Sequence, residues 1–185
     1  TEDESGTVSD IPQEYKERYL DDEWIVLDAE GSPIDRNFDG APDYYRYHPS
    51  APTIKAAAES LTEGEPTVYG KVKAIYEWIE DHFNYTTNEQ RSRDQAIYGQ
   101  WPKYPLGSLA DWYGDCDDQS LLMASMCRSV GIPAWLEIGY LYDPMAKSWG
   151  GHGWFNVVIP LKDRGTVVAP IDPVNHEFLF RDPYR

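Results

Sequence analysis

The stretch that decides the fold is "DWYGDCDDQSLLMASMCRSVGIPAW", Asp111 to Trp135, which holds both cysteines of the 185-residue chain. Its middle part, residues 116–130, is apolar nearly all round and is stopped by Gly131 and Pro133. A helix without a wide polar face is buried in the middle of a fold. We therefore predict a central helix whose first turn carries Cys116.

The two cysteines have different surroundings. Cys116 falls where the unpaired backbone N–H groups and the dipole of the predicted helix stabilise a thiolate. Asp115, Asp117 and Asp118 oppose a thiolate there, so the thiolate needs a cationic partner such as a histidine. Cys127 lies about 16 Å further along the helix axis, too far for a disulfide with Cys116. Taken alone, a cysteine at a helix start also fits a purely structural role.

Two later segments supply candidate partners for the cysteine. "GGHGWFNVVIP", residues 150–160, alternates as a strand does, and it opens with His152 between glycines. In "VVAPIDPVN", residues 167–175, Asp172 ends a predicted strand that Pro173 terminates. On an adjacent antiparallel strand, Asp172 is placed to reach His152 and to fix its ring.

The element order is helices first and strands afterwards, which predicts an α+β fold with an antiparallel sheet. We predict strands at 134–142, 152–160, 165–171 and 177–181, and a long surface loop over 86–106. The expected organisation has three parts: a flexible acidic tail (1–10), an N-terminal helix and β-hairpin with a calcium-type loop (11–50), and a catalytic domain (51–185).

Residues 71–173 resemble the transglutaminase-like superfamily. The matching pieces are "KVKAIYEWIEDHFNY", "GDCDDQSLLMASMCRSVGIPAWLEIGY", "GGHGWFNVVIP" and "IDP". The resemblance implies a papain-like core, in which a buried nucleophile helix packs on an antiparallel β-sheet. It also implies Cys116 as nucleophile, His152 as base and then acid, and Asp172 as the residue that orients the histidine. Gly153 departs from the alanine common in the family, and we expect this to be harmless.

These residues predict a cysteine-dependent acyl-transfer enzyme that acts on amide bonds of peptides or proteins through a thioester. Hydrolysis and transamidation both remain open; hydrolysis is favoured because nothing visible builds an amine-acceptor tunnel. The oxyanion needs donors, for which the candidates are the Cys116 N–H and the side chains of Gln100, Trp101 and Trp112. Two alternatives are a non-catalytic peptide- or glycan-binding module and a peptide-glycan amidase.

A second motif, "DRNFDGAPD", has oxygen-bearing side chains at alternate positions followed by a glycine that permits a sharp turn. Position 12 of an EF-hand would be Arg46, so the loop resembles the shorter calcium turns of extracellular modules. The predicted ligands of a structural Ca²⁺ are Asp35, Asn37, Asp39, the Ala41 carbonyl and Asp43. The alternative is a solvated acidic turn without an ion.

The charge and hydropathy of the chain limit its partners. A net charge of −16 argues against nucleic acid and anionic membranes as partners. No apolar run reaches the ~18 residues that span a bilayer. We expect a monomer that takes a peptide or protein substrate and needs no organic cofactor. The calcium-type loop, with a first residue other than Met, favours an extracytoplasmic or secreted location.

Overall fold

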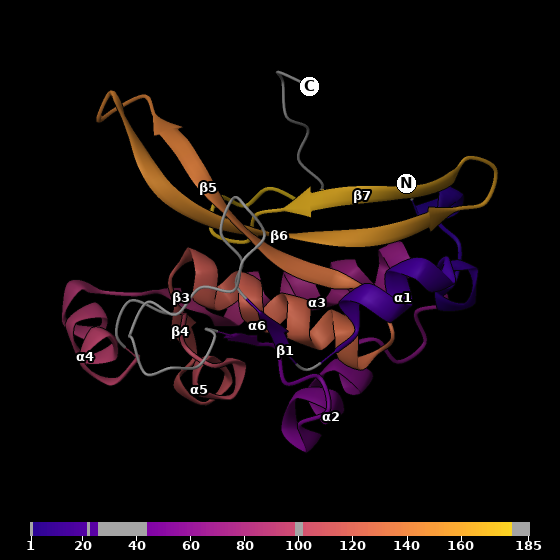
Figure 1. Cartoon of the computed structure of the whole chain (residues 1–185), viewed down its shortest axis with the longest axis horizontal. Helices are drawn as coiled ribbons and strands as arrows, with labels where there is room; N and C mark the ends of the chain where they lie inside the picture. The colour runs from indigo at the N-terminus through magenta and orange to yellow at the C-terminus, as the bar shows by residue number, and fades with distance from the viewer. Residues whose placement is uncertain (1, 22, 26–43, 99–101, 179–185) are drawn as a thin grey trace.

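The computed structural model describes residues 2–21, 23–25, 44–98 and 102–178. A three-stranded antiparallel sheet lies over one central helix, and the other long helices lie on the far side of that helix or beside it (Figure 1). The α-helices are α1 (Gln13–Tyr19), α2 (Pro52–Leu61), α3 (Val68–His82), α4 (Asn88–Tyr98), α5 (Pro105–Asp111) and α6 (Cys116–Ser129). The strands are β1 (Glu23–Ile25), β2 (Tyr44–Arg46), β3 (Asn84–Tyr85), β4 (Tyr113–Gly114), β5 (Ala134–Asp143), β6 (Ser148–Leu161) and β7 (Gly165–Ile171).

Helix α6 is the predicted central helix. Every residue from Asp118 to Arg128 is buried, and α6 packs against β5 and β6 on one side and against α2, α3 and α5 on others. Burying a leucine or methionine side chain stabilises a fold by about 2 kcal/mol, and Leu121, Leu122 and Met123 are all within the core. The absence of a polar stripe in the sequence is explained by this contact on all sides.

The end of α6 is fixed by a glycine and a buried arginine. Gly131 has a φ of 81°, a left-handed conformation that lets the chain leave the helix. Arg128 donates from Nε to the carbonyl of Ala134 (2.6 Å) and from a terminal nitrogen to the carbonyl of Asp21 (2.6 Å). Its guanidinium also lies over the ring of Tyr47 at 3.5 Å. The segment "RSVGIPAW" thus joins α6 to the sheet and to the N-terminal segment.

The sheet has the strand order β5-β6-β7, so each strand pairs with its neighbour in the chain. The β5–β6 register runs from Ala134↔Val157 to Asp143↔Ser148. The far half of this hairpin extends past the start of α6, at the upper left of Figure 1, and Tyr140 and Trp149 there are exposed. The predicted strands at 134–142, 152–160 and 165–171 are confirmed. Of the predicted strand at 177–181, residues 179–181 lie outside the described residues, and Glu177 forms an isolated bridge with Asp172.

Residues 2–10 differ from the expected flexible tail. Ser5 is 1% exposed and forms a bridge with Leu161, and the N–H of Gly6 donates to the carbonyl of Pro160 at 2.8 Å. Two short 3-10 helices, Glu2–Glu4 and Val8–Asp10, flank this contact. The acidic composition gave no indication of this contact, because the segment attaches to β6 through its backbone rather than through its side chains. Ile11 and Tyr47 belong to the same buried core as α6.

The expected loop over 86–106 was wrong in its first half, where the chain forms α4. The N–H of Gln90 donates to the Thr87 hydroxyl and the N–H of Thr87 donates to the Gln90 side chain, a reciprocal cap. The described part of α4 buries no side chain, so the sequence carries no apolar periodicity there. Within the described part of the chain, no helix combines the length and apolarity needed to cross a bilayer.

Candidate functional site

Cys116 is the first residue of α6, as predicted, and its free thiol is half-buried. Asp115 is the N-cap residue, and its backbone N–H donates to the Asp118 carboxylate at 3.2 Å. A Cβ at Gly114 would lie 2.6 Å from the Cβ of Asp118, so only glycine allows this close approach. The helix start therefore holds the thiol beside the first N–H groups of α6, which have no carbonyl partner one turn earlier in the helix.

His152 and Asp172 meet across the sheet, as the strand pattern predicts. His152 lies in β6, Asp172 directly follows β7, and His152 Nε2 lies 2.5 Å from Asp172 Oδ2. The Asp172 hydrogen bond, followed by a hydrogen bond with Cys116, raises the pKa of His152 to about 10. Burial works to raise the pKa of Asp172, but hydrogen bonds from His152 and Asn175 outweigh it and lower that pKa. His152 is thus joined to Asp172 by a hydrogen bond and lies close enough to Cys116 for the thiol to raise its pKa.

Three carboxylates surround the start of α6. One oxygen from each of Asp115, Asp117 and Asp118 lies within 4.8 Å of the others, close enough for a cation to bind between them. Burial raises the pKa of Asp117 and of Asp118, and the neighbouring Asp115 adds to both shifts. The backbone N–H of Lys103 donates to Asp118 at 2.6 Å and opposes the shift of Asp118.

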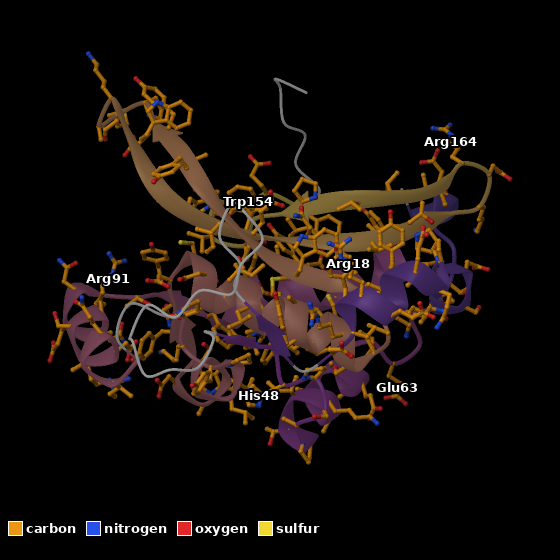
Figure 2. All side chains as sticks on the ribbon, viewed as in Figure 1. Arg18, His48, Glu63, Arg91, Trp154 and Arg164 are labelled. Carbon is orange, nitrogen blue, oxygen red and sulfur yellow. The ribbon has the colours of Figure 1, made fainter. Side chains whose placement is uncertain are left out.

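Tyr85 is a site residue that the sequence analysis did not single out. Strand β3 pairs in parallel with β4, and this places Tyr85 opposite Gly114, two residues before Cys116. Burial raises the pKa of the Tyr85 hydroxyl, and the charges of Cys116 and Asp115 raise it further. Arg91 of α4 lies 3.5 Å from that hydroxyl and 4.0 Å from Asp115. Figure 2 shows Arg91 on the α4 side of the molecule, away from Trp154 on the sheet.

Of the three predicted side-chain donors to the oxyanion, only Trp112 lies within the described residues; Gln100 and Trp101 lie outside them. Trp112 ends α5 in a left-handed conformation with a φ of 60°. Its ring packs against Trp78, His82 and Phe83, with ring centroids 5.4 to 6.0 Å away. Trp112 therefore belongs to a surface cluster of rings, because it is itself 45% exposed. The predicted calcium ligands Asp35, Asn37, Asp39, Ala41 and Asp43 also lie outside the described residues.

Lys103 is a buried lysine that links the elements around the start of α6, and no sequence pattern indicated it. The Lys103 side chain is fully buried, with Nζ 3.1 Å from Asp94 and 3.2 Å from Asp111. The ammonium also lies 3.6 Å from the centroid of the Tyr113 ring. Because its own N–H binds Asp118, Lys103 ties α4, α5 and β4 to the first turn of α6. "WPKYPLG" carries no periodicity or motif that would indicate a buried cation.

A family model of the transglutaminase-like superfamily matches residues 55–169, more than half of the chain. The chain belongs to this superfamily, and its mixed helix and sheet fold is the papain-like, transglutaminase-like one. The matched range includes Cys116 and His152 and ends before Asp172. None of the curated proteins compared with the chain matches it.

The chain is also similar to several solved structures at low identity. A protein of Cytophaga hutchinsonii, classed provisionally as a cysteine protease, is 21% identical over 67% of this chain and 37% of that one, with a TM-score of 0.49. The periplasmic domain of TgpA from Pseudomonas aeruginosa is 19% identical over 91% of this chain and 49% of its own, with a TM-score of 0.48. EGTA-treated LapG of Legionella pneumophila is 19% identical over 69% and 72%, with a TM-score of 0.45. The chain spans about a third to a half of the first two proteins.

Proposed function

We propose that the chain is a cysteine-dependent enzyme that hydrolyses or transfers acyl groups at amide bonds of peptides or proteins. The observation that carries this proposal is the contact chain from the Cys116 thiol at a helix start, through His152, to Asp172. A thiolate beside an imidazolium is the reactive form of such a cysteine. Membership of the transglutaminase-like superfamily supports the same chemistry.

In the proposed reaction the Cys116 sulfur attacks the amide carbonyl carbon and the carbonyl π electrons move to oxygen. In this proposal the backbone N–H of Cys116 donates to that oxyanion, because an N–H group in the first turn of a helix has no carbonyl partner one turn earlier. His152 gives its proton to the amine as the C–N bond breaks, and a thioester remains. His152 then takes a proton from water or from a second amine as that group attacks the thioester carbon. The C–S bond breaks, and Cys116 leaves as the thiolate beside the imidazolium.

Asp172 orients the histidine in this proposal. The hydrogen bond at Nε2 leaves Nδ1 as the ring nitrogen that exchanges a proton with the thiol in this proposal, and the buried carboxylate stabilises the imidazolium. The raised pKa of His152 supports this, because the ring then holds at neutral pH the proton that the leaving amine needs. An extracytoplasmic location, supported by the calcium-type loop of the sequence, belongs to the same proposal.

The decisive experiment measures thiol reactivity and turnover together. Iodoacetamide labelling at pH 7, read by peptide mass spectrometry, is expected to modify Cys116 far faster than Cys127. Fluorescein-labelled casein reports hydrolysis and dansylcadaverine incorporation reports amine transfer; Cys116→Ser is expected to abolish whichever the parent performs. Equal, slow labelling of both cysteines in the folded parent would contradict the proposal and favour a non-catalytic binding module. Release of an amino sugar from a glycopeptide would instead indicate a peptide-glycan amidase.

A further inference from the structure

The turn that follows β7 is built around the carboxylate of Asp172. The N–H of Asp172 donates to the carbonyl of Glu177 and the N–H of Glu177 donates back to the carbonyl of Asp172, at 2.9 and 3.0 Å. Inside this closed turn, Oδ1 of Asp172 accepts the backbone N–H groups of Val174 (3.1 Å) and Asn175 (3.2 Å). The backbone of the turn therefore anchors one oxygen of the carboxylate.

The second oxygen is anchored by side chains. Oδ2 of Asp172 lies 2.5 Å from His152 Nε2 and 2.6 Å from Asn175 Nδ2. The amide nitrogen of Asn175, rather than its oxygen, faces Oδ2, because two oxygens at this distance would repel each other. Four donors thus meet the four lone pairs of the carboxylate, and Asp172 is only 4% exposed.

The amide of Asn175 also limits how His152 binds. Its Nδ2 lies 3.2 Å from His152 Nε2, and both nitrogens point a hydrogen at the same oxygen. Rotation about the Cβ–Cγ bond moves both oxygens: the two backbone N–H groups resist it at Oδ1, and without the amide His152 alone resists it at Oδ2. With the amide in place, both oxygens are held and one lone pair of Oδ2 stays directed at Nε2.

We propose that Asn175 is a positioning residue of the site, which acts on His152 through Asp172. The inference rests on the proposed function, because it assigns Asn175 a part in keeping His152 cationic beside the Cys116 thiolate. Asn175 touches no reacting atom. Its removal leaves the nucleophile and its access unchanged and weakens only the support of the imidazolium. Hydrogen bonds to a charged acceptor are the stronger ones in proteins, so the loss is measurable even at an exposed residue.

The test uses iodoacetamide as the probe, so no substrate is needed. Asn175→Ala is expected to lower the rate of Cys116 alkylation at pH 6 about fivefold, the value of roughly one hydrogen bond. At pH 6 the thiolate depends on its imidazolium partner. At pH 10 bulk ionisation supplies the thiolate, and the rate is expected to stay within about twofold of the parent. A merely structural role would change access to the thiol and lower both rates together.

The matched control is His176→Ala, the neighbouring residue, whose Nδ1 binds Glu80 at 2.9 Å and whose side chain is 77% exposed. It is expected to leave both rates unchanged. The sharper control is Asp172→Asn: because Asn175 acts through Asp172, adding Asn175→Ala to it is expected to change the pH 6 rate less than about twofold. Asn175→Ser, which lacks the amide, replaces Asn175→Ala if thermal melts show that the alanine variant is unfolded.

The outcomes separate the inference from the proposed function. A folded Asn175→Ala protein whose Cys116 is alkylated at the parent's rate at pH 6 overturns the inference. The inference also fails if Asn175→Ala lowers that rate equally in the parent and in the Asp172→Asn protein. A parent protein whose Cys116 reacts no faster at pH 6 than the buried Cys127 contradicts the proposed function instead.

Discussion

At the scale of single residues, the two cysteines of α6 show how position decides chemistry. Cys127 is fully buried, and burial alone raises the pKa of its thiol to about 12, so it stays protonated and packed in the core. Cys116 has the same side chain at the helix start, within hydrogen-bonding contact of His152. Both roles were predicted from the sequence, because one cysteine follows a glycine and an aspartate while the other sits within an apolar run.

The histidines give the residue-scale prediction. His152→Ala is expected to lower turnover of casein or dansylcadaverine at least a hundredfold, the usual contribution of a general acid–base group. His176→Ala is expected to leave turnover within about twofold, because His176 contacts Glu80 and is mostly exposed. The assay is the initial rate of each variant at pH 7. If the His152→Ala protein is active and the His176→Ala protein is inactive, the base is His176 and not His152.

At the scale of elements, the contact between β6 and the first turn of α6 sets the site. A Cβ on Gly153 would lie 3.1 Å from both the Cα and the Cβ of Asp117 and 3.2 Å from its nitrogen. The two elements therefore touch through backbone, and the alanine common at this position in the family does not fit here without movement. The sequence analysis expected the glycine to be harmless, and the structure gives it a packing role.

Gly153→Ala is expected to destabilise the protein by about 1 kcal/mol through overpacking, and to slow Cys116 alkylation by moving the helix start. Gly151→Ala is the matched control, because a Cβ there has no atom within 4 Å. Urea denaturation measures the free energy of unfolding, and iodoacetamide measures the reactivity. Equal effects of the two substitutions would contradict the packing argument.

The buried ammonium of Lys103 gives a second prediction at this scale. Lys103→Met leaves Asp94 and Asp111 without their buried cation, and we expect a loss of about 3 kcal/mol in the free energy of unfolding. Lys73→Met is the control: Lys73 is exposed and pairs only with Glu77 on α3, so its loss is expected to cost no more than about 0.5 kcal/mol. Similar urea midpoints for the two variants would show that the Lys103 pairs do not stabilise the fold.

Asp117 predicts how stability depends on pH. Burial, and then Asp115, Asp118 and Cys116, raise its pKa to about 9, far above the ordinary value of 3.8. A raised folded-state pKa means that protonation favours the folded state, and this contribution is complete below pH ~4 and is lost as pH rises towards 9. In chelator-containing buffer, the melting temperature of Asp117→Asn is expected to exceed that of the parent increasingly between pH 5 and pH 9. A difference that does not change with pH would show that Asp117 is ionised throughout.

At the scale of the whole molecule, the charge of −16 makes cation binding the feature to measure. The sequence predicts one structural Ca²⁺ at Asp35, Asn37, Asp39, the Ala41 carbonyl and Asp43. Calcium that binds only the folded state raises the melting temperature as its free concentration rises. We expect this increase in the parent and its loss in Asp39→Ala, with little effect on Cys116 alkylation. If calcium stabilises Asp39→Ala as much as the parent, the ion binds elsewhere, and Asp117→Asn tests the carboxylates at the start of α6.

The sequence by itself determined the central helix and the strands, because an apolar run stopped by glycine and proline and alternation along a strand are local patterns. It also predicted the candidate set of Cys116, His152 and Asp172, because each of these residues stands at the end of an element. Only the tertiary structure decided the rest. Lys103 is buried because separate elements bring Asp94 and Asp111 to it, and residues 2–10 attach to β6 through backbone groups that every sequence shares. Asn175 reaches the Asp172 carboxylate because the turn that follows β7 folds back on Asp172, and only the fold sets the hydrogen bond between the Asn175 amide and that carboxylate. Contacts made between elements leave no periodicity in the chain, so they emerge only when the elements are placed together.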